Sequence, residues 1–196
     1  MLKNLKNSAV LTAATTSIAI AASLIIPINN HQSAVAATGP YCKFTPEEIA
    51  AKESLLKASF DAGNQASQEY QEIVKQHAEM LRLCRSHSWP EEQAIWLRLY
   101  PCDVTPGSIE AVLDDIVNQG YNKIHLEVFY DSQVLLPPGN NPTAWKSVVN
   151  TPGAENIDLL KQTIDKGRER GLKVYAWLFT MNFGYTYAQR PDRQDA

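Results

Sequence analysis

The feature that most constrains this chain is a helix, glycine and strand unit that occurs twice, with the two strands 50 positions apart. In the first copy, apolar residues at helical spacing predict an amphipathic helix over 109–119, Gly120 ends it, and a strand follows over 123–130. In the second copy, the helix covers 156–170 and ends at Gly171, and the strand covers 173–179. Two successive units of this kind predict an α/β fold with repeated strand and helix units.

A third strand is predicted over 94–100, and all three strands alternate between two kinds of face. The aliphatic faces are expected to pack on helices, and the other faces are expected to point together, toward the inside of a barrel or the top of a sheet. These mixed faces carry aromatic and charged residues: Trp96, Arg98, Tyr100, His125, Glu127, Phe129, Tyr175, Trp177 and Phe179. Charges inside apolar strands need partners, so Arg98 and Glu127 are expected to form a salt bridge. The alternative is a buried ion pair that only fixes packing.

A long loop is expected over 131–155, because this stretch is rich in proline, glycine and asparagine. Loops that follow the strands carry the site in strand–helix folds, and a connection of this length is usually functional. Sugar rings stack on aromatic side chains through their CH faces, while their hydroxyls bond to polar groups. The candidate sugar-binding residues are Arg98, Glu127, Tyr130, Asp131, Gln133, Trp177 and Asn182, with Trp145 and Tyr185 nearby.

The first 36 residues are interpreted as a signal peptide. Lys3 and Lys6 form a basic start, residues 9–26 are apolar and uncharged, and Ala34-Val35-Ala36 offers a cleavage site. The alternative is an uncleaved anchor helix, since the apolar run is barely long enough to span a bilayer. Export with cleavage predicts a secreted or periplasmic protein that has no membrane contact once the signal is removed.

Residues 37–90 are predicted to form a helical hairpin attached to the α/β part at 91–196. Thr45-Pro46-Glu47-Glu48 is a strong helix start, and a turn is expected at 61–64 between two helices. The rival arrangement is one long helix. A hairpin would bring Cys42 and Cys84 to its open end, where exported proteins readily form a disulfide, whereas one long helix would keep them far apart.

Composition and the absence of certain motifs argue against several classes of function. The chain is 44% hydrophobic and 20% charged, as expected for a globular protein, and its net charge of −3 without a basic patch argues against nucleic acid as a partner. The sequence contains no phosphate-binding glycine loop and no GxSxG motif. Its four histidines lack ligand spacing, so neither a metal nor another cofactor is expected.

Residues 96–196 resemble the glycosyl hydrolase-like family 10 domain of secreted bacterial proteins, and most closely its cyanobacterial members. The resemblance depends on Glu127-Val128-Phe129-Tyr130-Asp131, Pro142 with Trp145, Pro152-Gly153 and Asp158-Leu159-Leu160, and above all on the run from Arg170 to Trp177, RGLKVYAW. The chain departs from the family pattern at Arg168 and Tyr175, where relatives often carry histidine, and at Phe129 and Tyr130, where an arginine is usual.

This resemblance implies a TIM barrel of which the chain holds the first three strand–helix units. It also implies a glycosidase-type protein acting on a polysaccharide or cell-wall glycan, with a catalytic carboxylate pair that comes mainly from later strands. The chain alone is therefore expected to be inactive, and its catalytic residues remain unknown. Two alternatives stay open: a non-catalytic carbohydrate-binding or envelope-binding protein, and a helical interaction module with a remnant domain.

Overall fold

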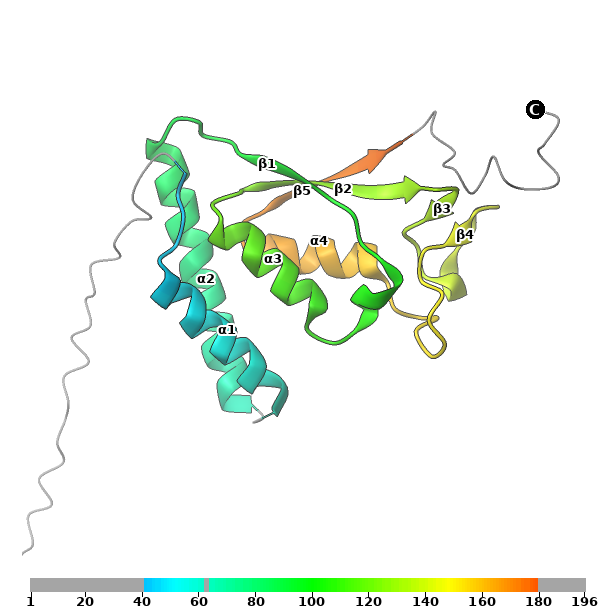
Figure 1. The fold of residues 1–196 in the computed structure, drawn as a ribbon, viewed down its shortest axis with the longest axis horizontal. Coiled ribbons are helices and arrows are strands. Elements are labelled where there is room, and N and C mark those ends of the chain that lie inside the picture. The colour runs from blue at the N-terminus through cyan, green and yellow to red at the C-terminus, as the bar shows by residue number, and fades with distance from the viewer. Residues whose placement is uncertain (1–40, 62–63, 180–196) are drawn as a thin grey trace, which may run out of the picture. The chain divides into compact units, whose positions relative to one another are not determined.

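The computed structural model describes residues 41–61 and 64–179, which belong to one compact unit. The expected signal peptide and Asn182 lie outside these residues. Within them the chain is mixed α/β, with four α-helices and five strands (Figure 1). The helices are α1 (Pro46–Asp61), α2 (Asn64–His87), α3 (Ser108–Asn118) and α4 (Leu159–Glu169). The strands are β1 (Ala94–Leu97), β2 (Lys123–Tyr130), β3 (Gln133–Val134), β4 (Lys146–Ser147) and β5 (Lys173–Leu178), and short 3-10 helices cover Pro101–Val104 and Pro138–Asn140.

Strand β2 is the centre of the sheet, with β1 and β5 parallel to it on either side. The β2–β5 register follows the repeat in the sequence from Lys123 opposite Lys173 to Glu127 opposite Trp177. A bulge then pairs Phe129 with Leu178 instead of with Phe179. The strand–helix order β1–α3–β2–α4–β5 therefore places successive parallel strands side by side.

The stretch after β2 is not the plain loop expected from its composition. Asp131 and Ser132 both have positive φ values, 47° and 59°, and form a tight turn that reverses the chain into β3. Strand β3 is antiparallel to β2, and β4 pairs parallel to β3. The sheet is consequently mixed, because two short strands extend it beyond the end of β2.

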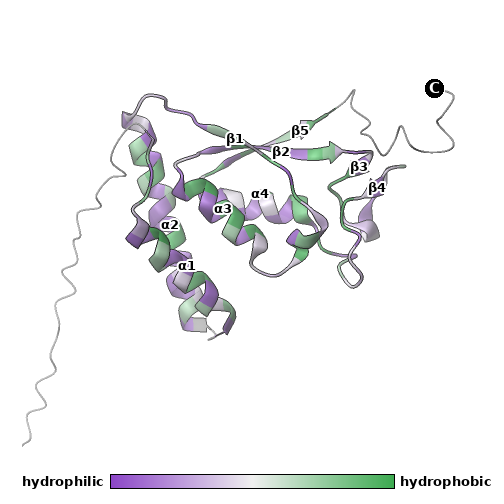
Figure 2. Ribbon diagram, viewed as in Figure 1, coloured by the Kyte–Doolittle hydropathy of each residue, from purple (hydrophilic) through white to green (hydrophobic). Residues whose placement is uncertain are grey.

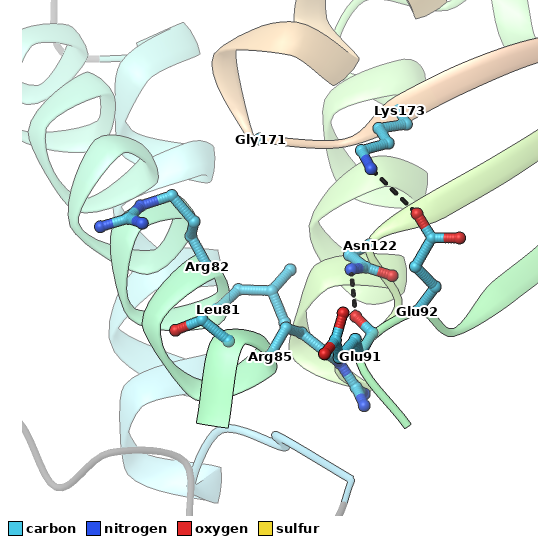
Figure 3. A pocket seen from close by; sticks show the side chains of 9 residues that line it. Leu81, Arg82, Arg85, Glu91, Glu92, Asn122, Gly171 and Lys173 are labelled. Atoms are coloured by element: carbon cyan, nitrogen blue, oxygen red, sulfur yellow. Dashed lines mark hydrogen bonds and ion pairs between the residues drawn. The ribbon is translucent and has the colours of Figure 1, made fainter. Parts of the chain in front are cut away.

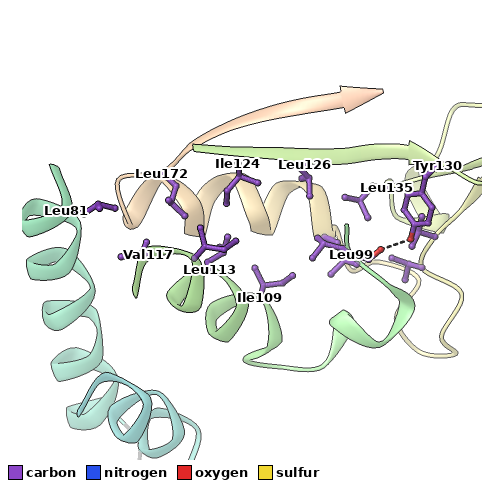
Figure 4. Packing of buried hydrophobic residues seen from close by; sticks show 14 of the residues in the cluster. Leu81, Leu99, Ile109, Leu113, Val117, Ile124, Leu126, Tyr130, Leu135 and Leu172 are labelled. Carbon is purple, nitrogen blue, oxygen red and sulfur yellow. Dashed lines mark hydrogen bonds between the residues drawn. The ribbon is translucent and has the colours of Figure 1, made fainter. Parts of the chain in front are cut away.

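The main core lies between the sheet and helices α3 and α4, which cover one of its faces (Figures 1 and 4). Ile124 and Leu126 on β2 are fully buried, and Figure 4 shows them directed toward the helix layer that holds Ile109 and Leu113. The period-2 alternation of β2 and the apolar stripe of α3 make this contact, as their spacing predicts.

The helices α1 and α2 form a hairpin that shares the core of the α/β part. A disulfide joins Cys42, before α1, to Cys84, near the end of α2, as the hairpin expectation requires. Figure 2 shows hydrophilic and hydrophobic residues alternating along α2, as expected for a helix with one packed side. Phe44 and Leu81 belong to the same buried cluster as Ile124, so packing is continuous across the expected boundary at residue 90.

A close backbone approach fixes the hairpin at Gly120. A Cβ atom at this glycine, whose φ is 84°, would lie 1.8 Å from the carbonyl oxygen of Tyr41. The buried guanidinium of Arg85 donates to the carbonyl oxygens of Gly120 and Tyr41, and its burial lowers the Arg85 pKa. The segment before α1 is thus held against the turn between α3 and β2.

Candidate functional site

An aromatic surface covers the side of the sheet that faces away from α3 and α4. Trp96, His125 and Tyr175 stand opposite one another on β1, β2 and β5, with ring centroids 6.3 Å and 5.7 Å apart. Trp177 lies 5.6 Å from Trp96 and 5.2 Å from Phe179, so the rings form one group. We call these five residues the aromatic face. Trp96 is 70% exposed and Tyr175 is 46% exposed, so the aromatic face is accessible to a ligand.

Arg98 and Glu127 form the expected salt bridge on the same side of the sheet. Arg98 Nε lies 2.5 Å from Glu127 Oε2, and Nη2 lies 3.1 Å from Oε1, so the pair is bidentate. This hydrogen bonding raises the pKa of Arg98. The Glu127 side chain is buried but that of Arg98 is 46% exposed, so the pair is only half-buried. Removing one partner should therefore cost less than the roughly 3–5 kcal/mol of a fully buried pair.

The geometry gives Glu127 a positioning role. Both of its carboxylate oxygens accept hydrogen bonds from Arg98, which leaves the exposed side of the guanidinium turned toward solvent. A glycosidase acid must deliver a proton to a leaving group, and a carboxylate fully engaged by arginine is poorly suited to that step.

Tyr130 does not fit the sugar-binding role expected from the sequence. It lies on the same side of β2 as Ile124 and Leu126, its side chain is buried, and its hydroxyl donates to the Leu99 carbonyl oxygen at 2.5 Å (Figure 4). Burial raises its pKa to about 12. The Arg98 guanidinium carbon lies 4.6 Å from the centre of its ring, so Tyr130 supports Arg98 from the core side.

The remaining candidates lie in separate parts of the structure. Trp177 belongs to the aromatic face, with Arg98 and Glu127 on the same side of the sheet. Asp131 lies in the turn between β2 and β3, and Gln133 borders a polar hollow of about 610 Å³ formed by the stretch 133–155. Trp145 packs edge-on against Phe129 at 5.2 Å, beside an apolar hollow of about 480 Å³ next to Leu178.

A buried polar network between the hairpin and the α/β part was not predicted. The Asp114 carboxylate on α3 accepts from the Tyr70 hydroxyl at 2.7 Å and from Arg170 Nε at 3.0 Å, and Lys52 Nζ lies 3.4 Å away. We call Lys52, Tyr70, Asp114 and Arg170 the Asp114 network; all four are at least 96% buried. Burial lowers the pKa of Lys52 and raises that of Tyr70.

A sequence signal for half of this network does exist. Glu110 and Asp114 are four residues apart on α3, and Lys166 and Arg170 are four residues apart at the end of α4. The acidic and basic pairs are both offset by 56 positions, and the structure joins Glu110 to Lys166 and Asp114 to Arg170. Matching charges at spacing i, i+4 on two successive helices indicate that these helices lie side by side. No comparable signal marks Lys52 or Tyr70.

A smaller hollow of about 230 Å³ lies at the seam between α2 and the amino ends of the strands (Figure 3). Two of its charged groups are paired with each other, Lys173 with Glu92, and a third, Arg82, is paired with Glu79 on the same helix. Hydrogen bonds from Lys123 and Lys173 hold the pKa of Glu92 at about 2. The pairs of Glu92 with Lys123 and Lys173 join the starts of β2 and β5 to the segment before β1, which is a structural role.

In the part of the chain that the structure describes, no three His, Cys, Asp or Glu side chains are grouped as a metal site would require. Across the same residues, no helix is long and apolar enough to cross a bilayer. No protein-family model matches the chain, and neither a search of curated proteins nor a search of solved structures finds a match.

Proposed function

We propose that this protein binds a polysaccharide through the aromatic face of its sheet, as a glycosyl hydrolase-like protein that does not hydrolyse glycan with this chain alone. The observation that carries the proposal is the in-register row Trp96, His125 and Tyr175, in which exposed rings on β1 and β5 flank a partly exposed ring on β2. Exposed aromatic rings of this extent on a soluble domain mark a binding surface.

The charged pair beside the rings adds the polar half of a sugar site. Arg98 is oriented by Glu127 and keeps 46% of its side chain exposed, so its free N–H groups can donate to sugar hydroxyls. The rings of Trp96 and Trp177 supply apolar surface for the CH faces of a pyranose. Apolar surface combined with a few placed polar groups is the usual composition of a small-molecule site.

The fold and the location of the protein belong to the same proposal. Adjacent parallel strands in the order β1, β2, β5, with α3 and α4 on one side, support the proposal that these are three successive units of a TIM barrel. The basic start, apolar run and Ala34-Val35-Ala36 site support export to the periplasm or outside the cell, where polysaccharide is met.

Affinity gel electrophoresis or pull-down on a panel of soluble and cell-wall polysaccharides tests this proposal. Replacing Trp96 with alanine is expected to weaken binding at least tenfold, because it removes the most exposed ring of the aromatic face. Trp89→Ala is the matched control, since Trp89 is 87% exposed but lies in the connection before β1. Equal retention of both variants and the unchanged protein would contradict the proposal, as would binding to no member of the panel.

A further inference from the structure

The stretch 133–155, which begins after the β2–β3 turn, is held in place by hydrogen bonds. Val148 N donates to the Val134 carbonyl at 2.9 Å, and Gly139 N donates to the Glu155 carbonyl at 3.0 Å. The Ser147 hydroxyl donates to the Leu136 carbonyl and accepts from Val149 N. Thr151 Oγ1 donates to the Pro101 carbonyl at 3.1 Å, which ties the stretch to the connection after β1.

This stretch lines the polar hollow of about 610 Å³, which is open to solvent and has a volume within the range of small-molecule sites. Buried Val149 lies at its floor, while the side chains of Gln133, Lys146 and Asn150 stand at least partly exposed around it. Among the residues that the structure describes, these three side chains have no hydrogen-bond or ion-pair partner. The hollow therefore offers two complete amides and one ammonium group to a ligand.

The lining excludes several ligand classes. Lys146 is its one positive group and Glu155 its one negative group, so the charges cancel and do not favour a strongly charged ligand such as a phosphate ester. Hydrogen bonds from backbone N–H groups, including that of Gly153, lower the pKa of Glu155, which keeps it an acceptor. No aromatic ring lines the hollow, and its apolar lining is limited to Pro138 and Val149, so it is poorly suited to a flat aromatic ligand.

Once strongly charged and flat aromatic ligands are excluded, a ligand rich in hydroxyl groups matches the polar lining of the hollow. Each amide presents one acceptor and two donors at fixed geometry, and a sugar hydroxyl both donates and accepts. We propose that the hollow bordered by Gln133, Lys146 and Asn150 is a second glycan-binding site, which holds an uncharged sugar residue by its hydroxyl edge. The aromatic face would hold sugars by their CH faces, so the two sites differ in their chemistry. This inference shares the ligand class of the proposed function but uses none of its residues.

Nuclear magnetic resonance of the full chain tests the second site directly, because the side-chain amides of Gln133 and Asn150 give their own signals. The probes are cello-, xylo- and malto-hexaose, titrated separately, with glycerol at the same hydroxyl concentration as a control. We expect saturable shifts of both amide signals with at least one hexaose and none with glycerol. Shifts of equal size with glycerol would overturn the proposal, and so would unshifted amide signals with all three probes.

Variants separate this site from the aromatic face. The double variant Gln133→Ala/Asn150→Ala removes up to six hydrogen bonds and is expected to weaken the binding of that hexaose about tenfold or more. Asn140→Ala is the matched control, because Asn140 is an exposed amide on the same stretch that does not line the hollow. Backbone pairing of Gln133 with Tyr130 and Lys146 does not need its side chain, so the double variant should fold.

The outcomes distinguish the two proposals. If Trp96→Ala weakens hexaose binding and the double variant does not, the second site is wrong and the aromatic face stands. If the double variant weakens binding and Trp96→Ala does not, the second site stands and the proposed function of the aromatic face is wrong. Weakening by Asn140→Ala to the same extent as the double variant would also overturn the second site.

Discussion

Replacing Asp114 with asparagine should be among the most destabilising polar substitutions in this protein. Asp114 is the single anion of the Asp114 network, and it lies within 3.4 Å of Lys52 and within 3.0 Å of Arg170. Asparagine keeps the shape and can still accept from Tyr70, but it leaves two cations in a site where the side chains are at most 6% exposed. Removing one partner from a buried ion pair costs about 3–5 kcal/mol, a large fraction of the roughly 5–15 kcal/mol that stabilises a domain.

Removing one cation of the Asp114 network should lower the free energy of unfolding far less than removing its anion. Lys52→Met removes one of two cations and leaves Asp114 paired with Arg170, so no buried charge loses its balance. Methionine fills the space of the lysine stem, and the lost attraction between Lys52 and the Phe44 ring, 5.8 Å apart, is small. We expect a loss of about 1 kcal/mol or less in the free energy of unfolding.

Urea unfolding followed by circular dichroism at pH 7 measures both variants against Asp115→Asn, the same change at an exposed neighbour on α3. The control is expected to stay within about 0.5 kcal/mol of the unchanged protein. A loss below about 1.5 kcal/mol for Asp114→Asn, or an equal loss for Lys52→Met, would show that the network is not a buried charge balance.

Three further predictions follow from the structure. Burial, with Lys52 nearby, holds the pKa of His77 at about 4, and the unfolded side chain titrates near 6.5, so the unfolded state binds more protons between these values. Stability should therefore fall by about 3 kcal/mol as the pH drops from 6.5 to 4, whereas the urea midpoint of His77→Gln should change less over this pH range. An identical pH dependence of the urea midpoint in the two proteins would contradict this prediction. Reducing the Cys42–Cys84 disulfide, which closes a loop of 42 residues, should cost about 4 kcal/mol in unfolding measurements, whereas Cys102→Ser, at an exposed free thiol, should change little; equal stability with and without reductant would refute this. Reducing-sugar assays with the full chain should detect no turnover on the polysaccharide panel, and turnover that Glu127→Gln abolishes would show that this carboxylate is catalytic.

Most of the secondary structure could be predicted from local periodicity in the sequence. The alternation in 123–130 and the apolar spacing in 109–119 predict β2 and α3 within two residues of their observed ends. The repeat also anticipates the β2–β5 register, because equivalent positions in successive units face the same layer of helices. The short strands β3 and β4 escaped prediction, since two-residue strands contain no measurable alternation and proline and glycine dominate their surroundings.

For the candidate site, too, some features could be predicted from the sequence and others depend on tertiary packing. Alternation groups His125 with Glu127 and Tyr175 with Trp177, because residues two apart on a strand point to the same face. The packing of the aliphatic faces on helices then predicts that these residues and Trp96 share one side of the sheet. Which of the candidates are accessible was decided by the tertiary structure: Tyr130 is buried against Leu99, while Gln133 borders a hollow that strand pairing creates. The Asp114 network needed the tertiary structure most, since its members are up to 118 positions apart and lie on the hairpin, α3 and the end of α4. Periodicity reports on neighbours along the chain, whereas the burial of a charge depends on which distant segments pack around it.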